Sequence, residues 1–385
     1  MFERFVQVVD LSYYVILHFV LLIPSYFYSP ILDFLTMTSN KMRALVFNQH
    51  GGPEVLEYSE VDIPNLSPTD MLVKVHACAL NHLDIFVREG IPGSHLSFPH
   101  ISGGDISGVV AEVGSHVKEV KKGDRVLIDP RITCGKCSYC LTGESNRCKG
   151  KEHGNLGEEY WGGLAEYVVA PAKNAIKMPE EASFEEAAAL PIAYATAWRM
   201  LVTRAQLQPG ESVLILGASG GLGTAGVQIA NLMGAEVYAA TSTEEKMQLA
   251  LERGAHHVIN YAEEDFSRSI WKLTGKHGVD VVFEHVGKET WNGSIRSLAN
   301  GGRMVTCGAT TGYDAMTDIR YLFSREISIL GSRGWQRKDL QQLASVVWRG
   351  ELTPIIDRKL PLDNAIDGLL AMKNRNLTGK VIITP

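Results

Sequence analysis

The pattern of hydrophobic and polar residues changes near residue 183. Before that point, short segments alternate apolar and polar residues between glycine and proline turns, a pattern typical of β-strands. The predicted strands are 42–47, 71–77, 108–113 and 125–128. Short strands separated by such turns predict a β-rich, partly open barrel.

After residue 183, strands and helices alternate. Residues 184–202 are rich in alanine and leucine and predict a helix. The predicted strands are 212–216, 236–240, 257–261, 279–284, 303–307 and 326–330, with a last strand over 380–383. A helix over 222–233 stops at Gly234, and the next begins with capping-box spacing between Ser242 and Glu245. This alternation predicts an α/β fold with a doubly wound parallel sheet.

Length and composition agree with a globular protein of about two domains. The chain has 385 residues, of which 45% are hydrophobic and 21% charged, so it can bury a core. The formal net charge of −6 does not favour a nucleic-acid surface.

The first 41 residues form a separate hydrophobic segment. Residues 13–23 are almost wholly apolar, which is short for a membrane span of about 20 residues. Glu3 offsets Arg4 and no small-residue cleavage site follows, which argues against a signal peptide. Three interpretations remain open: a start-site artefact with Met37 or Met42 as the true first residue, a membrane-associating extension, or a folded addition. Any membrane contact is expected only through residues 1–36.

A glycine-rich turn joins the predicted strand 212–216 to the helix that follows. Glycines allow a tight turn and close approach to a pyrophosphate, and the helix N-terminus supplies free amides. The expected cofactor-binding residues of this turn are Gly217, Gly220, Gly221, Leu222 and Gly223. The alternative is a tight turn without a ligand.

The end of the next strand bears on which nicotinamide cofactor binds. An acidic residue there would bind the ribose hydroxyls of NAD, but the position holds Thr241, followed by Ser242. With Lys246 one turn further on, the residues favour NADP(H) over NAD. Glu244 and Glu245 keep NAD open, although a helix start explains these two carboxylates equally well.

Four cysteines lie close together in one predicted loop, at Cys134, Cys137, Cys140 and Cys148. An all-cysteine set favours a closed, structural zinc site. Free cysteines and an iron–sulfur cluster are the alternatives. Cys78 and Cys307 are isolated and are expected to be buried in strands.

In combination, these features resemble the medium-chain dehydrogenase/reductase superfamily, which includes zinc alcohol dehydrogenases and quinone oxidoreductases. The matching segments are 51–56, 80–84, 103–108, the cysteine cluster, 188–198, the glycine turn and 379–381. The resemblance implies a GroES-like catalytic domain of residues 42–182 plus 334–385, with a zinc lobe at 134–148. It implies a Rossmann domain over 183–333 and a homodimer paired through residues 326–332.

The chain departs from the zinc alcohol dehydrogenases at their second, catalytic zinc. The ligands there are a cysteine, a histidine and a second cysteine, and the matching positions hold Asn81, Gly104 and Ile192. In this respect the chain resembles the quinone oxidoreductase branch, which usually lacks the four-cysteine lobe. The resemblance therefore implies a subgroup with a structural zinc and no catalytic zinc.

The resemblance also assigns single residues. Asn81 is expected near the nicotinamide, with a purely local loop role as its alternative. Asp84 is expected to orient that loop or to pair with Arg88, and Asp105 to replace a glutamate beside the metal. Thr196 is expected beneath the nicotinamide ring, whereas Lys246 and Tyr261 are expected at the 2′-phosphate. His82 is either a proton relay or structural.

The sequence thus predicts an NADP(H)-dependent oxidoreductase that transfers hydride to a quinone or conjugated carbonyl. One rival is a zinc alcohol dehydrogenase with unusual ligands such as Asp105 and His82. The other is a non-catalytic cofactor-binding protein, as with lens crystallins of this superfamily. A cytoplasmic homodimer acting on a small molecule, without nucleic acid, is expected.

Overall fold

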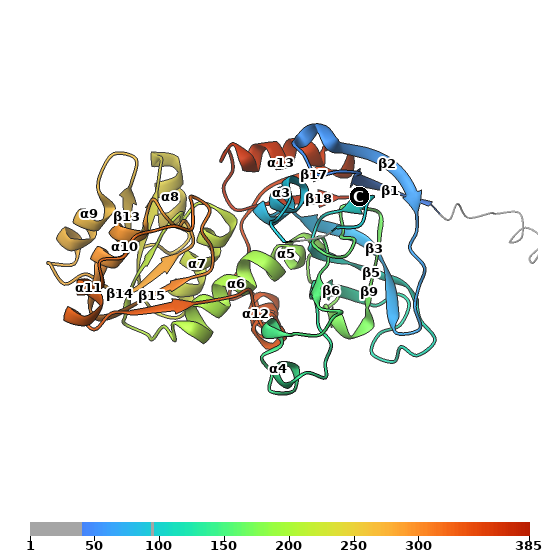
Figure 1. The fold of residues 1–385 in the computed structure, drawn as a ribbon, viewed down its shortest axis with the longest axis horizontal. Coiled ribbons are helices and arrows are strands. Elements are labelled where there is room, and N and C mark those ends of the chain that lie inside the picture. Colours follow the sequence, from blue (N-terminus) through green and yellow to red (C-terminus); the bar gives the residue numbers. More distant parts are fainter. Residues whose placement is uncertain (1–40, 94–95) are drawn as a thin grey trace, which may run out of the picture. The chain divides into compact units, whose positions relative to one another are not determined.

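The computed structural model describes residues 41–93 and 96–385 (Figure 1). Residues 42–385 form one compact unit. The predictions for residues 1–40 lie outside the described residues. Within the described ranges, every helix is too short or too polar to cross a membrane.

A six-stranded parallel sheet forms from the alternating segments, in the order β13-β12-β11-β14-β15-β16. Its strands are Ser212–Ile215 (β11), Glu236–Thr241 (β12), His257–Asn260 (β13), Val279–Glu284 (β14), Leu298–Thr306 (β15) and Ser328–Gly331 (β16). The central strands β11 and β14 are buried along almost their whole length, as their continuous apolar runs require. The predicted doubly wound sheet is therefore confirmed.

Helices connect these strands (Figure 1). They are Gly221–Leu232 (α7), Glu244–Glu252 (α8), Phe266–Leu273 (α9), Trp291–Ser297 (α10) and Ile319–Ser324 (α11). One predicted boundary was wrong: α8 is capped by Thr243, whose side chain accepts a hydrogen bond from the Lys246 backbone N–H at 3.3 Å. The cause is that β12 continues to Thr241, which moves the helix start one residue beyond Ser242.

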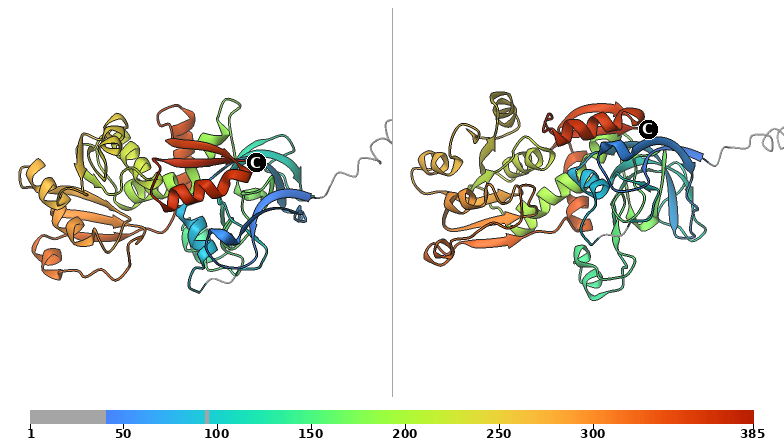
Figure 2. Two further views of the ribbon diagram at one scale, coloured as in Figure 1. Left: turned by 90° about the horizontal axis from the view of Figure 1, so that it is seen from above. Right: turned by 45° about the horizontal axis from the view of Figure 1, so that its top comes forward.

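The β-rich part is built around β3 (Asp70–Ala79), which pairs with β5 (Asp105–Val113), β9 (Tyr167–Pro171) and β18 (Lys380–Thr384). The same sheet holds Arg125–Ile128 (β6), Ala175–Lys177 (β10) and Ile356–Pro361 (β17). A second sheet holds Lys41–Phe47 (β1), Leu56–Asp62 (β2) and His100–Ile101 (β4), and a small one pairs Arg131–Ile132 (β7) with Gly154–Asn155 (β8). Figure 2 shows β17 and β18, in red, beside strands from the beginning of the described chain.

The remaining helices position the two sheets. They are His82–Glu89 (α3), Ser138–Leu141 (α4), Phe184–Ala188 (α5), Ala195–Trp198 (α6), Arg337–Trp348 (α12) and Ala365–Lys373 (α13), with single 3-10 turns at 53–55, 145–147, 172–174 and 362–364. The predicted helix over 184–202 forms, but Leu190–Tyr194 and Arg199–Arg204 are wider π-helical turns. Pro191 lies within the first of them, and proline cannot donate the regular helical hydrogen bond.

Two large apolar clusters stabilise the unit. One contains residues of β11, β14 and α7 together with α6 and α12, including Phe283, Trp198 and Leu340. The other fills the β-rich part around β3, β5 and β18. Helix α6 precedes the strands of the parallel sheet in sequence, and α12 follows them. Because these two helices pack on each other, the segments before and after the sheet join the same apolar cluster.

Candidate active site

The glycine turn follows β11 and begins α7, as the sequence predicts. Gly217 has a left-handed backbone (φ 56°), and Gly220 is the N-cap of α7 without a side-chain capping bond. A Cβ on Gly223 would lie 2.1 Å from the Gly217 carbonyl oxygen, so only glycine allows the helix to pass this close. Leu222 packs its side chain against the apolar core. The turn therefore leaves helix N–H groups open to an anionic ligand.

The C-terminal strand contacts this turn directly. The Gly379 N–H donates to the Ser219 carbonyl at 3.0 Å, and Gly220 forms an isolated β-bridge with Gly379. A Cβ on Gly221 would lie 2.9 Å from the Lys380 side chain. Lys380 thus passes beside the turn before its ammonium reaches the β-rich part.

That ammonium is the centre of a buried polar network. Lys380 Nζ donates to the Leu80 carbonyl at 2.8 Å, to Asn81 Oδ1 at 2.7 Å and to Asp105 Oδ2 at 2.9 Å. Asn81 Nδ2 donates to Asp105 Oδ2 at 2.8 Å and to the Ala79 carbonyl at 3.2 Å. Both amide hydrogens of Asn81 are therefore committed to protein acceptors. The structure places Asn81 as a residue that holds this network.

Asp84 holds the loop that carries Asn81. Its carboxylate accepts the Asn81 N–H at 2.7 Å and the Gly103 N–H at 2.9 Å. Arg88 instead reaches Glu89 and the Gly51 carbonyl, so the alternative pairing with Asp84 does not form. Burial raises the pKa of Asp84 to about 7, although the two N–H bonds act in the opposite direction. This agrees with the loop-orienting role considered for Asp84.

The three positions that match the catalytic zinc ligands come together, but their donor chemistry does not fit zinc. A Cβ on Gly104 would lie 2.9 Å from Ile192 Cδ1 and 2.9 Å from the Leu156 carbonyl, so no histidine fits there. Asp105 bonds the Ile192 N–H at 2.7 Å through its other oxygen, which commits both oxygens. Among the described residues, the one group of metal-ligating side chains that converges is elsewhere, at the four cysteines.

Two histidines, His82 and His285, lie close enough for the charge of one to affect the other. Burial of the ring and the charges of Lys380, His285 and Arg375 lower the pKa of His82, although the residue as a whole is exposed. His285, at the end of β14, donates from Nε2 to the Leu216 carbonyl at 2.8 Å. A Cβ on Gly217 would lie 3.1 Å from its ring, so His285 packs directly against the glycine turn.

The residues expected around the cofactor ribose differ in accessibility. Ser242 and Lys246 are half-buried and Tyr261 is exposed, so all three are open to a ligand. Lys246 Nζ donates to the Arg375 carbonyl at 3.2 Å, and Lys246 lines a shallow depression together with Ser219. The Thr241 hydroxyl, in contrast, is fully buried and has no hydrogen-bond partner among the described residues. Thr196 is nearly buried, on α6.

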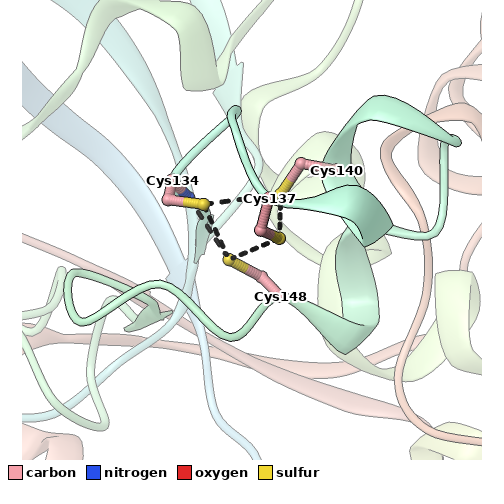
Figure 3. Close-up of side chains that lie close together, drawn as sticks. All are labelled: Cys134, Cys137, Cys140 and Cys148. Atoms are coloured by element: carbon pink, nitrogen blue, oxygen red, sulfur yellow. Dashed lines mark hydrogen bonds between the residues drawn. The ribbon is translucent and has the colours of Figure 1, made fainter.

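The four cysteines converge around one point (Figure 3). Their Sγ atoms all lie within 4.8 Å of one another, and four of the separations are 3.5–4.0 Å. A tetrahedron of thiolates about 2.3 Å from zinc has edges of about 3.8 Å. The Cys134 and Gly150 N–H groups point at Cys148 Sγ, at 3.3 and 3.4 Å. The geometry and the donor set therefore fit a closed zinc site.

The protonation chemistry of this cluster also fits a cation. Backbone N–H groups of Lys149 and Cys140 lower the pKa of Cys137 to about 6. Burial and the neighbouring sulfurs raise the pKa of Cys140 to about 12, because a second thiolate beside the first is unfavourable. A divalent metal removes this conflict by accepting all four thiolates.

Sequence reasoning missed Lys380 as a site residue. Two signals could have found it: Lys380 lies in the matching segment 379–381, and it begins the apolar strand 380–384, where a charge must find a buried partner. Asp105 was expected only as a structural substitute, and its partner lies 275 residues away. No local pattern joins two such distant positions.

Comparisons with known proteins agree with this architecture. The family described as zinc-binding dehydrogenase matches residues 221–349, and the alcohol dehydrogenase GroES-like domain matches residues 67–180. The quinone oxidoreductase of Pongo abelii is 31% identical over 350 residues, which cover 89% of this chain and 97% of that protein.

Alcohol dehydrogenases are similar to the same extent. An NAD-dependent alcohol dehydrogenase of Sulfolobus acidocaldarius is 34% identical over 352 residues, covering 89% of this chain and 99% of that protein. The crystal structure of an NAD-dependent alcohol dehydrogenase superposes with a TM-score of 0.85 at 40% identity, covering 89% and 100% of the two chains. The chain therefore belongs to the medium-chain dehydrogenase/reductase superfamily of oxidoreductases.

Proposed function

We propose that this chain is an NADP(H)-dependent oxidoreductase that transfers hydride to a quinone or a conjugated carbonyl, with a structural zinc and no catalytic zinc. The observation that carries the proposal is the Lys380–Asp105–Asn81 network, which occupies the place where a catalytic zinc would need its ligands. A quinone or enone spreads the incoming negative charge over a conjugated system, so its reduction needs less help from a Lewis acid than that of a simple ketone.

Bound NADPH would supply the hydride, and the cysteine-bound zinc would only cross-link the lobe 134–148. The chain's own residues would bind the cofactor and position its nicotinamide. The glycine turn at 217–223 would hold the pyrophosphate, and Thr196 would lie beneath the nicotinamide. The buried Lys380 ammonium, paired with Asp105, fixes the Asn81 side chain through its Oδ1 atom. Asn81 and Asp84 act here as positioning residues, and solvent would supply the proton.

The preference for NADP(H) is supported by three residues that follow β12 and β13. Ser242, Lys246 and Tyr261 are accessible and include no carboxylate, so they suit the additional 2′-phosphate. Because the Thr241 hydroxyl is fully buried, we propose no direct contact between Thr241 and the cofactor. NAD remains the alternative cofactor, since similar alcohol dehydrogenases are described as NAD-dependent.

A zinc-dependent alcohol dehydrogenase is the second candidate function, favoured by the likeness to those same alcohol dehydrogenases. It would require zinc ligands such as Asp105 and His82, but both Asp105 oxygens are committed and the residue is fully buried. A non-catalytic, crystallin-like cofactor-binding role is the third, because an intact glycine turn suits it equally well.

Steady-state kinetics separate these candidates. We expect NADPH oxidation with quinones and enones, little NADP⁺ reduction with primary alcohols, and one zinc per chain. Strong alcohol oxidation that depends on a second zinc would contradict the proposal. NADPH binding without turnover across a broad panel of acceptors would favour the non-catalytic role.

The proposal also covers the domain boundaries, the oligomeric state and the location of the protein. We assign residues 42–182 plus 334–385 to the catalytic domain and 183–333 to the nucleotide-binding domain. A homodimer would pair residues 326–332 edge to edge, since the nearby side chains of Met316, Ile319 and Phe323 are 82%, 66% and 73% exposed. Sedimentation analysis would test it. We place the protein in the cytoplasm, without nucleic-acid partners.

A further inference from the structure

Arg131, at the start of β7, has an unusual environment for an arginine. Its guanidinium lies over the Trp335 ring, with Cζ 4.7 Å from the ring centroid. Its Nη2 lies so close to Gly334 that a Cβ there would be 2.2 Å away. Its Nε is sealed from solvent and has no hydrogen-bond partner among the described residues. An unpaired, partly buried guanidinium is costly, which points to a missing partner.

A second arginine lies beside the first. Arg333 precedes Gly334, and its charge adds to burial, the larger cause, in lowering the pKa of Arg131. Within residues 41–93 and 96–385, no carboxylate oxygen comes within the 4.0 Å of a salt bridge to either guanidinium. Neither guanidinium therefore has a direct ion-pair partner among the described residues, although the charges of Asp129 and Glu158 act on Arg131 from farther away.

The two nearest carboxylates are already engaged. Asp129 accepts the Arg131 backbone N–H at 3.2 Å and the Trp335 indole N–H at 3.1 Å. Glu158 accepts the Asn155 side-chain N–H at 2.6 Å, and burial raises its pKa. These carboxylates therefore leave the two guanidinium groups free to bind another acceptor.

The pair lies close to the candidate reaction centre. Pro130, next to Arg131, would be 3.7 Å from a Cβ on Gly104, the position that matches the family's histidine ligand. Arg131 pairs across the β7–β8 ladder with Asn155, and the following Leu156 covers Gly104. On the other side, Arg333 follows β16, at the edge of the parallel sheet that carries the glycine turn. Residues next to Arg131 in sequence or across the β7–β8 ladder therefore contact Gly104.

We propose that Arg131 and Arg333 bind an anionic oxygen group, a carboxylate or a phosphate, carried by the acceptor substrate. The inference rests on the proposed function, because it names the class of acceptor: a quinone or enone with an acidic substituent. The planar guanidinium of Arg131 is held by Trp335 and Gly334. Because its Nε is sealed from solvent, bidentate contact with such a group would use the two Nη atoms.

Equilibrium binding tests this site without requiring turnover. The full chain, loaded with NADP⁺, is titrated calorimetrically with 3-benzoylpropionate, its methyl ester and 3-oxo-3-phenylpropylphosphonate. These probes share one ketone and differ in the acidic group, so the carboxylate and phosphate arms are read separately. Arg131→Met is the test variant. Arg125→Met is the matched control, because Arg125 also stacks on an aromatic ring and has a buried, unpartnered Nε, but donates to the Ala182 carbonyl.

We expect at least one acid to bind about tenfold or more tightly than the ester in the wild-type chain, the strength of a charge-assisted bidentate contact. Arg131→Met should remove this preference while leaving ester affinity within about twofold, and Arg125→Met should keep it. Equal affinity for acids and ester in the wild type, or a preference that survives Arg131→Met, overturns the proposal.

If Arg131→Met does not fold, the exposed Arg333→Ala replaces it. A loss of about threefold or more in acid preference supports the pair, and an unchanged preference overturns it. Acid binding through Arg131 in a chain that reduces no acceptor would contradict the proposed function and leave this site standing.

Discussion

Lys380 Nζ lies 2.9 Å from an Asp105 carboxylate oxygen, and the two side chains are only 2% and 0% exposed. This ion pair joins the strand beside the cofactor turn to the strand that carries the candidate reaction centre. Burying two charges is unfavourable unless each is fully hydrogen-bonded, and here the ammonium has three oxygen acceptors. The pair is therefore expected to be sensitive to the loss of either partner.

Lys380→Met should lower the free energy of unfolding by about 3–5 kcal/mol, because it leaves the Asp105 carboxylate buried without a counter-charge. Adding Asp105→Asn should recover part of this loss. Lys359→Met on β17 is the control, since its pair with Glu185 is exposed and should contribute about 1 kcal/mol or less. Urea unfolding measures all three, and equal effects at Lys380 and Lys359 would refute the argument.

Gly220→Ala and Gly223→Ala should separate folding from cofactor binding. A Cβ on Gly220 would meet nothing closer than 3.8 Å, whereas one on Gly223 would collide with the Gly217 carbonyl. Gly220→Ala should therefore keep the wild-type unfolding temperature but raise the NADPH Kd about tenfold, because a methyl group blocks the pyrophosphate. Fluorescence titration measures the Kd, and an unchanged value would show that no cofactor approaches Gly220. Gly223→Ala should lower both stability and affinity.

Lys246→Ala should distinguish the two cofactors. Removal of an accessible ammonium from the 2′-phosphate should raise the Kd for NADPH about tenfold and change that for NADH by less than about twofold. The two nucleotides serve as internal controls for each other in the same titration. Parallel losses for both would assign Lys246 to the structure of α8 instead.

Removal of the four-cysteine site should affect stability before chemistry. Metal analysis should find one zinc per chain, and Cys137→Ser should lose it together with several degrees of unfolding temperature. Cys307→Ser is the control, because Cys307 lies apart from the cluster. NADPH affinity should stay within about threefold in both variants. Full zinc retention after Cys137→Ser would contradict the tetrahedral site.

Asp84 should give the protein an unusual pH dependence. Since its pKa rises from 3.8 to about 7 in the folded chain, folding favours the protonated form. The stability from this proton is complete below pH about 4 and is lost as the pH rises through about 7. Asp84→Asn cannot lose a proton there, so the wild-type unfolding midpoint should fall relative to the variant between pH 5 and 8. Parallel curves would show that Asp84 keeps an ordinary pKa.

Local patterns predicted much of this fold. The apolar strands around 212–216 and 279–284, the glycine turn and the cysteine spacing each reflect neighbours in sequence, and the structure has them where expected. The start of α8 was missed by one residue, because adjacent hydroxyl residues at 242 and 243 both suit a helix cap.

Local patterns could not predict which residues from distant segments pair in the folded chain. That Asn81 lies near the nicotinamide stays a prediction, and the local sequence did not show that its amide hydrogens bond Asp105 and the Ala79 carbonyl. Lys380, the counter-charge of Asp105, lies 275 residues away, and Trp335, which stacks on Arg131, comes from a similarly distant segment. Burial is equally nonlocal, as Thr241 shows: the residue type suits a phosphate, yet the folded chain covers it.

The position of β18 determines when the buried network can form during synthesis of the chain. Residues 380–384 pair with β3 and lie beside the glycine turn, and they bring the ammonium that completes the network at Asn81. A ribosome produces the glycine turn and Asn81 long before this strand. Until residues 380–384 dock, Asn81 and Asp105 lack the ammonium that joins them, so assembly of this network depends on a segment made long after both residues.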